Sequence, residues 1–442
     1  MADMHPAVKG KETWPKGADA TIRRTMVCSE TQPRSTPETS SSRRPALRWR
    51  DRLEGWLFHP ASRRFVVVCV TASFGLFFLL INKWLVTGLG LFTFGRVWPF
   101  FVSYRDFGFV RRAFIGTLLD LSHACSLFRN EYVFAYCVAI TTGALLFLLL
   151  GLLVARTRHI HRVHVLCICL SPSILHFSMG TGTLDMFLFV ILLLILLSRK
   201  SLVAMALLTV AGVFTHEAML FYVPFLLATF NLPTEDSSRR RNLLASGVVA
   251  TAALVAALVV VLHGKTTVDR GTYMSVMATK IPNAAGKHAF WSGYYELASG
   301  IHDNARVTHD YVAPIFENHN WLWLVVPLTY IAILAALTFY VQAVPLVWRL
   351  AHTVGILFPL TICFVAADSP RWFCMSANLG LLSTLFAVGA SKLIVPRRAL
   401  VLLLCFFVVA PFGKTDYRRP FPMHQMVVEK LEKAYRSRKA NH

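Results

Sequence analysis

Apolar residues in this chain are gathered into long runs, which are separated by short polar and often basic segments. A helix needs about 20 mainly apolar residues to cross the hydrocarbon core of a bilayer, and several runs approach or reach that length. The pattern therefore predicts membrane-spanning helices. The predicted spans are residues 65 to 82, 131 to 155, 164 to 178, 185 to 198, 202 to 230, 243 to 262, 320 to 345, 351 to 367, 372 to 390 and 400 to 412.

The run from residue 202 to residue 230 is too long for one upright helix. Thr215, His216 and Glu217 interrupt it near its centre, so we predict two short helices that form a hairpin. With a cytoplasmic N-terminus, this hairpin puts the basic loops on the cytoplasmic side, as the positive-inside rule requires. These loops are Arg156 to Arg162, Arg199-Lys200, Arg239 to Arg241, Arg349 and Lys392 to Arg398. The prediction is an all-α, polytopic membrane protein with about 10 to 11 transmembrane helices.

The segments outside the spans divide the chain into a basic, disordered cytoplasmic tail (1–64), a transmembrane domain (65–412) and a basic C-terminal tail (413–442). Aromatic and basic residues near 47–58 suit a short interfacial helix. Two outer loops, 83–130 and 266–318, are longer than a connection needs. We expect an interfacial helix over 106–125 in the first, from its apolar spacing, and order in the second, from its aromatic content.

Composition excludes several classes of protein. The chain has 55% hydrophobic and 15% charged residues, which argues against cytosolic, secreted and fibrous proteins. Its net charge of +22 is explained by the basic loops and the tail, and no basic domain with interleaved aromatic residues suggests nucleic-acid binding. The nine cysteines form neither a disulfide framework nor a CxxC motif. His159, His161 and His164 lie in a basic loop, where we expect no metal site.

Asp106 is the first candidate for chemistry, because Arg105, Arg111 and Arg112 lie close to it in the sequence. Nearby positive charge keeps a carboxylate ionised, so Asp106 could accept a proton while the arginines hold a phosphate. The alternative is an interfacial helix whose charged side chains reach the lipid headgroups.

Three further short motifs carry ionisable residues beside or within the apolar runs. Asp185 follows a glycine-rich turn and either caps a helix or faces a cavity. His216 and Glu217 are costly at membrane depth, which favours a polar cavity over a hydrogen bond between helices. A metalloprotease HExxH motif is excluded, because position 220 is leucine. Asp368 and Arg371 either form a plain turn or serve a function.

The predicted topology brings these residues to one membrane face, although it was derived from the basic loops alone. A single polar site is the simplest explanation. The residues concerned are Asp106, Asp185, His216, Glu217, Asp368 and Arg371.

The motifs DFGFVRRAFIG, HE and DSPRW, with the long first outer loop, resemble elements of the multispanning C-type glycosyltransferases and the related bacterial envelope polysaccharide polymerases. The resemblance covers residues 65–412. It implies a polyprenyl-phosphate-linked sugar donor and an acidic residue of the first outer loop as the base, which here is Asp106. Many members have two adjacent acidic residues there, whereas this chain has Asp106 alone beside Arg105, so the base and any dependence on a divalent metal stay open.

The expected function is therefore transfer of a sugar from a polyprenyl-phosphate carrier to a glycan or lipid acceptor on the non-cytoplasmic face of a bacterial inner membrane, without a cofactor. Arg111, Arg112 and Arg371 would hold the phosphate, and His216 and Glu217 would order the cavity or assist proton transfer. Arg105, Asp185 and Asp368 would complete the substrate site. A transporter or flippase for an anionic lipid-linked sugar is the main alternative, and a membrane acyl- or phosphotransferase with a catalytic histidine is a third class.

Overall fold

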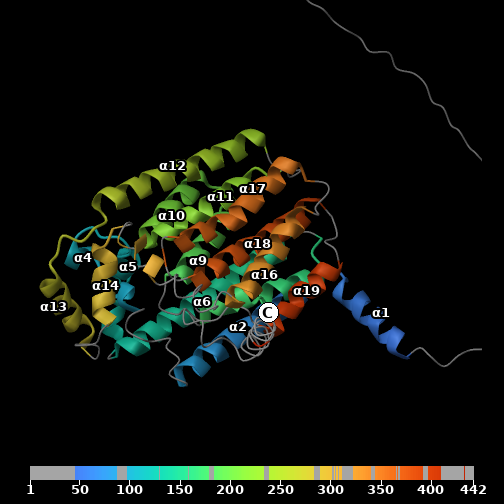
Figure 1. Ribbon diagram of the computed structural model, residues 1–442, viewed down its shortest axis with the longest axis horizontal. Coiled ribbons are helices and arrows are strands. Elements are labelled where there is room, and N and C mark those ends of the chain that lie inside the picture. Colours follow the sequence, from blue (N-terminus) through green and yellow to red (C-terminus); the bar gives the residue numbers. More distant parts are fainter. Residues whose placement is uncertain are drawn as a thin grey trace, which may run out of the picture. The chain divides into compact units, whose positions relative to one another are not determined.

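In the residues that the computed structural model describes, helices are joined by turns and loops and there are no strands (Figure 1). Contacts divide the chain into Met1–Arg50, of which only 45–50 are described, and Asp51–His442, to which all that follows refers. The all-α prediction is confirmed for these residues. The predicted tails, 1–64 and 413–442, lie largely outside the described residues. The described end of the first tail forms α1 (Pro45–Leu57), in agreement with the helix predicted over 47–58, so the prediction of disorder as far as residue 64 is wrong. Apart from a few single positions, the described ranges are 45–86, 97–128, 130–157, 159–178, 184–232, 238–282, 289–300, 322–339, 344–364, 369–391 and 397–409.

Five segments of the described chain are long and apolar enough to cross a membrane. They lie in α2 (Arg63–Val86), α6 (Glu131–Arg156), α12 (Arg239–His263), α17 (Leu346–Leu357) with its continuation η6 (Phe358–Phe364), and α18 (Ser369–Ser391). In α18, 89% of the apolar stretch is buried, compared with 22% in α12. Helix α18 is therefore central in the structure, and α12 is peripheral.

The other predicted spans are also helical, but their apolar helices are shorter or interrupted. The run beginning at residue 164 breaks before Pro172, because proline cannot continue the hydrogen-bond ladder of a helix. These segments are α7 (Arg162–Cys169), α8 (Pro172–Leu175), η3 (His176–Ser178), α9 (Asp185–Leu197), α10 (Leu202–Thr215), η4 (Glu217–Tyr222), α11 (Val223–Phe230), α16 (Leu322–Phe339) and α19 (Arg397–Val409).

The predicted hairpin over 202–230 is confirmed by contacts at its open end. Arg199, which precedes α10, donates a 2.9 Å hydrogen bond to the carbonyl oxygen of Thr229 at the end of α11. The start of α10 therefore lies beside the end of α11. At the tip, His216 has an extended backbone (φ −164°) that ends the first helix. His216 and Glu217, which are costly to place at membrane depth, thus lie where the chain reverses.

The basic loops lie at one end of the helices, which we call the basic end. Arg241 donates to the carbonyl oxygen of Lys200 at 2.7 Å, which joins the starts of α12 and α10. A small core cluster there joins the ends of α11 and α18 to the start of α17; it consists of Leu232, Val344, Trp348 and Ala387. The predicted grouping of the basic segments is therefore confirmed for the residues that are described.

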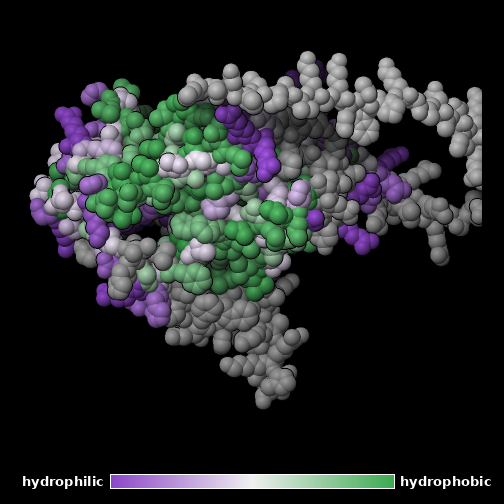
Figure 2. Space-filling model, turned by 90° about the horizontal axis from the view of Figure 1, so that it is seen from above, coloured by the Kyte–Doolittle hydropathy of each residue, from purple (hydrophilic) through white to green (hydrophobic). Residues whose placement is uncertain are grey.

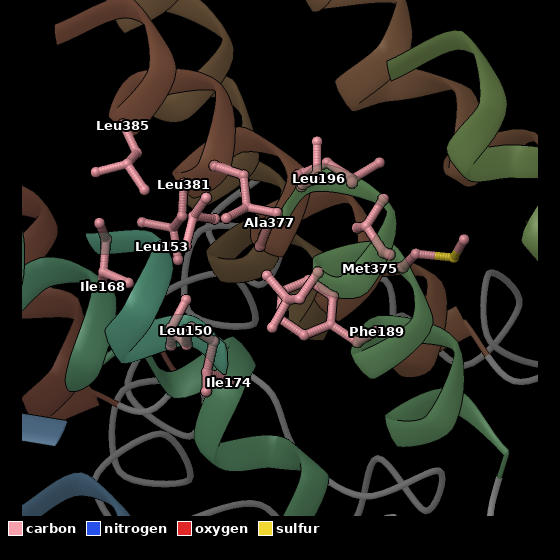
Figure 3. Packing of buried hydrophobic residues seen from close by; sticks show 14 of the residues in the cluster. Leu150, Leu153, Ile168, Ile174, Phe189, Leu196, Met375, Ala377, Leu381 and Leu385 are labelled. Carbon is pink, nitrogen blue, oxygen red and sulfur yellow. The ribbon is translucent and has the colours of Figure 1, made fainter. Parts of the chain in front are cut away.

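Apolar side chains of α6, α7, α8, α9 and α18 meet in the main core (Figure 3). Leu150 and Leu153 of α6 contribute to it beside Phe189 of α9, with Ala377 and Leu381 from α18. These five side chains are at least 94% buried. By contrast, the outer faces of α10 and α12 expose large apolar side chains such as Leu207, Leu254 and Val261. An apolar core inside an apolar surface suits helices that lie in lipid.

The segment before α6 differs from the predicted single helix over 106–125. It forms η1 (Trp98–Phe100), α4 (Tyr104–Phe107), α5 (Phe114–Leu121) and η2 (Ala124–Leu127). A turn with left-handed backbone at Gly108 (φ 66°) and Arg112 (φ 64°) breaks the helix, so the prediction of one continuous helix is wrong.

A second core joins this segment to the other outer loop, where α13 (Arg270–Lys280) and α14 (Ala289–Ala298) lie. Trp98, Phe107 and Tyr273 are at least 97% buried in it. The prediction of order in 266–318 is thus confirmed over the described part of that loop, where the ordered structure is helical. The two outer segments form one packed layer at the end of the helices opposite the basic end.

We predict that Gly116→Ala destabilises this outer layer. A Cβ atom at Gly116 would lie 2.0 Å from the carbonyl oxygen of Val102 and 2.7 Å from that of Pro99, and backbone cannot move aside as a side chain can. Overpacking of this kind costs about 1–3 kcal/mol. Thermal unfolding in detergent should show a lower midpoint than the parent, whereas Gly75→Ala, which opens into free space, should change it little.

Candidate functional site

Arg112 is the centre of an ion-pair group between the outer layer and the hairpin tip. Its Nη2 and Nε donate to the two carboxylate oxygens of Glu217, at 2.8 and 3.3 Å. Its Nη1 is paired with the carboxylate of Glu296 from α14. The side chain of Arg112 is 16% exposed, against 31% for Glu217 and 41% for Glu296. One guanidinium therefore joins the first outer segment, the hairpin and the second outer segment.

Arg111 fixes the backbone from which Arg112 projects. Its backbone N–H donates to the carbonyl oxygen of Gly264 at 2.9 Å, just after α12. Its guanidinium donates to the backbone carbonyl oxygens of Ser299, at 2.6 Å, and of Glu296. These contacts offset the cost of the left-handed backbone at Arg112, a conformation that non-glycine residues rarely adopt. The two adjacent arginines therefore have different partners: Arg111 binds backbone carbonyl oxygens, and Arg112 binds carboxylates.

Because only Arg112 is closely held by carboxylates, the pKa values of the two arginines are shifted in opposite directions. Burial lowers the pKa of Arg111, and the carboxylate of Glu217, 3.9 Å away, only partly opposes that effect. Burial also acts against the charge of Arg112, but the carboxylates of Glu217 and Glu296 outweigh it and raise the pKa of Arg112. Since a guanidinium is not deprotonated in proteins, both side chains stay charged.

A second ion pair connects α9 and α18. Arg371 donates from Nε and Nη2 to the two carboxylate oxygens of Asp185, at 2.5 and 2.7 Å. This arrangement is the bidentate geometry in which a planar guanidinium matches a carboxylate. The guanidinium carbon also lies 5.0 Å from the ring centroid of Trp372. Asp185 therefore pairs with an arginine 186 residues away as well as beginning a helix.

His216 is close enough to both ion-pair groups to interact with their charges, those of Arg112 and Glu217 and those of Asp185 and Arg371, and its Nδ1 is 3.5 Å from a carboxylate oxygen of Glu217. Its Nδ1 accepts a 3.0 Å hydrogen bond from the N–H of Ala218, which assigns the proton of the neutral ring to Nε2. We therefore treat both groups as one charged cluster. The charged cluster is Arg111, Arg112, Asp185, His216, Glu217, Glu296 and Arg371.

A small cavity borders the cluster at Asp185 and Arg371, with Tyr222 and His176 also in its wall. Its volume is about 10 Å³, which is room for about one water. No substrate fits there in this arrangement. A ligand larger than water that entered this cavity would therefore have to displace side chains of its wall.

The structure separates Asp106 from the charged cluster. Its carboxylate is bonded to Lys280 of α13 and to the hydroxyl of Ser103, and Lys280 also lies 3.8 Å from Asp120. Arg105 is exposed. The hypothesis that three arginines surround Asp106 is therefore wrong, because the turn at Gly108–Ala113 directs the chain of Arg111 and Arg112 elsewhere. The predicted site residue Asp368 lies outside the described residues.

Sequence reasoning missed Glu296 and Lys280, the two outer-loop residues that pair with predicted site residues. Both lie in the 266–318 loop, for which the prediction used the aromatic residues and not the charged ones. A charged residue near buried aromatic positions is the pattern that would have found them. Among the described residues, no group of three His, Cys, Asp or Glu side chains is arranged to hold a metal; in the His159–His164 loop, the rings of His161 and His164 stack at 5.6 Å.

Comparisons with protein-family models, with curated proteins and with solved structures gave no match. The functional conclusions below therefore depend on the residues and contacts of this chain.

We predict strong coupling between Asp185 and Arg371 in a double-mutant cycle. Removal of one partner of a buried ion pair leaves an uncompensated charge and costs about 3–5 kcal/mol, whereas removal of both costs less than the sum. Asp185→Ala, Arg371→Ala and the double variant should be compared by unfolding in detergent. Additive effects would mean that the bidentate pair contributes no coupling to the fold.

Proposed function

We propose that this protein is a multi-pass membrane glycosyltransferase that uses a lipid-phosphate-linked sugar. The basic end would face the cytoplasm, and the charged cluster would lie on the other side of the membrane. The five long apolar helices and the grouping of basic segments at one end support this placement. A bacterial inner membrane is the location that the resemblance implies.

Convergence of the arginines is the observation that carries the proposal. Arg111 and Arg112 come from the first outer segment, and Arg371 comes from the start of α18, yet all belong to the charged cluster. Carboxylates already neutralise these arginines, so an anionic ligand would bind by taking the place of one carboxylate. A phosphate suits such a site, because guanidinium groups recognise phosphate in the same forked geometry as carboxylate.

Glu296 would be the carboxylate that the phosphate replaces. It is the most exposed acid on Arg112, and it comes from α14 in the outer loop, not from the apolar helices. Exchange of one anion for another leaves Arg112 paired throughout, so no buried charge is left without a partner. The loop helix would then move away from Arg112 as substrate arrives.

Glu217 would accept the proton in the reaction. Both of its oxygens are bonded to Arg112, and a carboxylate held in this way is a weak proton acceptor. A phosphate that takes the place of Glu296 on Nη1 would draw the guanidinium away from Glu217 and so leave this carboxylate able to accept a proton beside the acceptor. The acceptor hydroxyl oxygen then attacks the anomeric carbon, its proton passes to Glu217, and the bond to the lipid phosphate breaks with both electrons leaving on the phosphate oxygen.

Asp106 takes a different role in this proposal from the one that the resemblance implies. Its pairing with Lys280 joins the first outer segment to α13, so it would hold together the layer that covers the cluster. Asp185 would position Arg371 through their ion pair, and His216 would position Glu217 at the hairpin tip. Asp368, which precedes Arg371 by three residues, stays a candidate substrate contact from its sequence position.

We predict opposite effects of two substitutions on anion binding. Arg112→Lys keeps the charge but loses the fork, so it should weaken binding of farnesyl phosphate by about 10-fold or more. Glu296→Gln removes a competing anion from a partly exposed pair and should strengthen binding by about two- to fivefold. Titration in nanodiscs measures both, with farnesol as the control that lacks phosphate. If both variants bind as the parent does, the phosphate site is not at Arg112.

We predict that Glu217→Gln lowers sugar transfer by about 10²–10⁴, the usual effect of losing a general base. Asp106→Asn, which disturbs only the contact with Lys280 and Ser103, should lower it less. The assay uses radiolabelled polyprenyl-phosphate hexoses in proteoliposomes. Full transfer by Glu217→Gln together with loss by a well-folded Asp106→Asn would return the base to Asp106. Movement of the lipid-linked sugar across the bilayer without transfer would instead indicate the transporter.

A further inference from the structure

A long apolar groove lies on the outer surface between α10 and α12, and its wall contains no residue of the charged cluster. Its volume is about 730 Å³, within the range of small-molecule sites. Ala206 and Val210 form one wall from α10, and Gly247, Thr251 and Val255 form the other from α12. Figure 2, seen from the side on which α12 lies in Figure 1, shows hydrophobic side chains over much of this face.

Arg240 closes one end of the groove, at the basic end. From Arg240 to Val255 the groove follows 15 residues of helix, or about 22 Å at 1.5 Å per residue. One leaflet of a bilayer has about half of a 30 Å hydrocarbon core. The groove is therefore long enough for an acyl chain of the leaflet that adjoins the basic end, with Arg240 at the level of the headgroups.

Arg240 differs from the neighbouring arginines in its contacts. Arg199 and Arg241 donate to backbone carbonyl oxygens, of Thr229 and of Lys200 respectively. Among the described residues, no carboxylate pairs with Arg240, and its side chain is exposed. The two connections that meet here, 198–201 and 231–241, carry five basic against two acidic residues. The local field therefore favours an anion beside Arg240.

We propose that this groove is a binding site for one anionic phospholipid, with an acyl chain along α10 and α12 and the headgroup phosphate on Arg240. Apolar walls exclude a polar ligand, and the basic charge at the groove's end distinguishes an anionic from a zwitterionic lipid. The site depends on the proposed membrane setting but not on the proposed reaction.

Native mass spectrometry of the full chain, released from nanodiscs that contain equal phosphatidylglycerol and phosphatidylcholine with identical chains, tests the proposal. The parent should retain phosphatidylglycerol preferentially. Arg240→Gln should reduce that preference about fivefold, whereas Arg239→Gln, outside the groove wall, should not.

Gly247→Trp should reduce retention of both lipids, because the indole would occupy the groove. No atom lies within 4 Å of a Cβ built at Gly247, so the protein can fold around the new side chain. Gly75→Trp, on α2, is the matched control, since its Cβ also meets open space. Thermal unfolding of each variant shows that the fold is kept.

Four outcomes would overturn the proposal. They are equal retention of the two lipids by the parent, equal effects of the two arginine substitutions, unchanged retention in Gly247→Trp, and a dimer that Gly247→Trp dissociates. The last would identify a second copy of the chain as the occupant.

Discussion

Charged side chains set among apolar helices must be paired, and the end of this protein that carries the charged cluster depends on that constraint. A buried ion without a partner costs several kcal/mol, so each charge determines where another must lie. Arg112 holds Glu217 at the hairpin tip and Glu296 in the outer loop, and Arg371 holds Asp185. These contacts connect helices and loops that the apolar contacts alone would leave free to slide, because apolar packing has little directional preference.

The same constraint shapes the proposed reaction. A cluster in which every arginine has a partner can accept an anion only by exchange, so substrate binding and release of a carboxylate become a single event. That coupling would keep Glu217 inactive until a phosphate reaches Arg112, which limits proton transfer without substrate. It also accounts for the small cavity beside Asp185 and Arg371, since the ligand would use space now filled by protein side chains.

The two ends of the protein use basic residues differently. At the basic end, Arg241 donates to a backbone carbonyl oxygen and Arg162 lies over the ring of Trp56, and among the described residues there the carboxylate of Glu54 is a loose and exposed partner of Arg397 at 3.9 Å. Most of the positive charge at this end is therefore not neutralised. At the other end, carboxylates neutralise the arginines. The first arrangement attracts anionic lipid at the surface, and Arg240 in its apolar groove is where we place one. The second selects an anion that can compete with a carboxylate.

The sequence by itself determined the helices, the hairpin reversal at His216 and the grouping of basic loops. These features depend on local apolar length and on the cost of placing ionisable residues within it, which neighbouring residues reveal. Only the tertiary structure decided which charged residues form ion pairs with one another. Glu296 meets Arg112 from 184 residues away, and Lys280 meets Asp106 from 174. A left-handed backbone at Arg112 turned a predicted continuous helix into a loop. Such choices depend on long-range geometry, because any arginine can satisfy any carboxylate that the fold brings within reach.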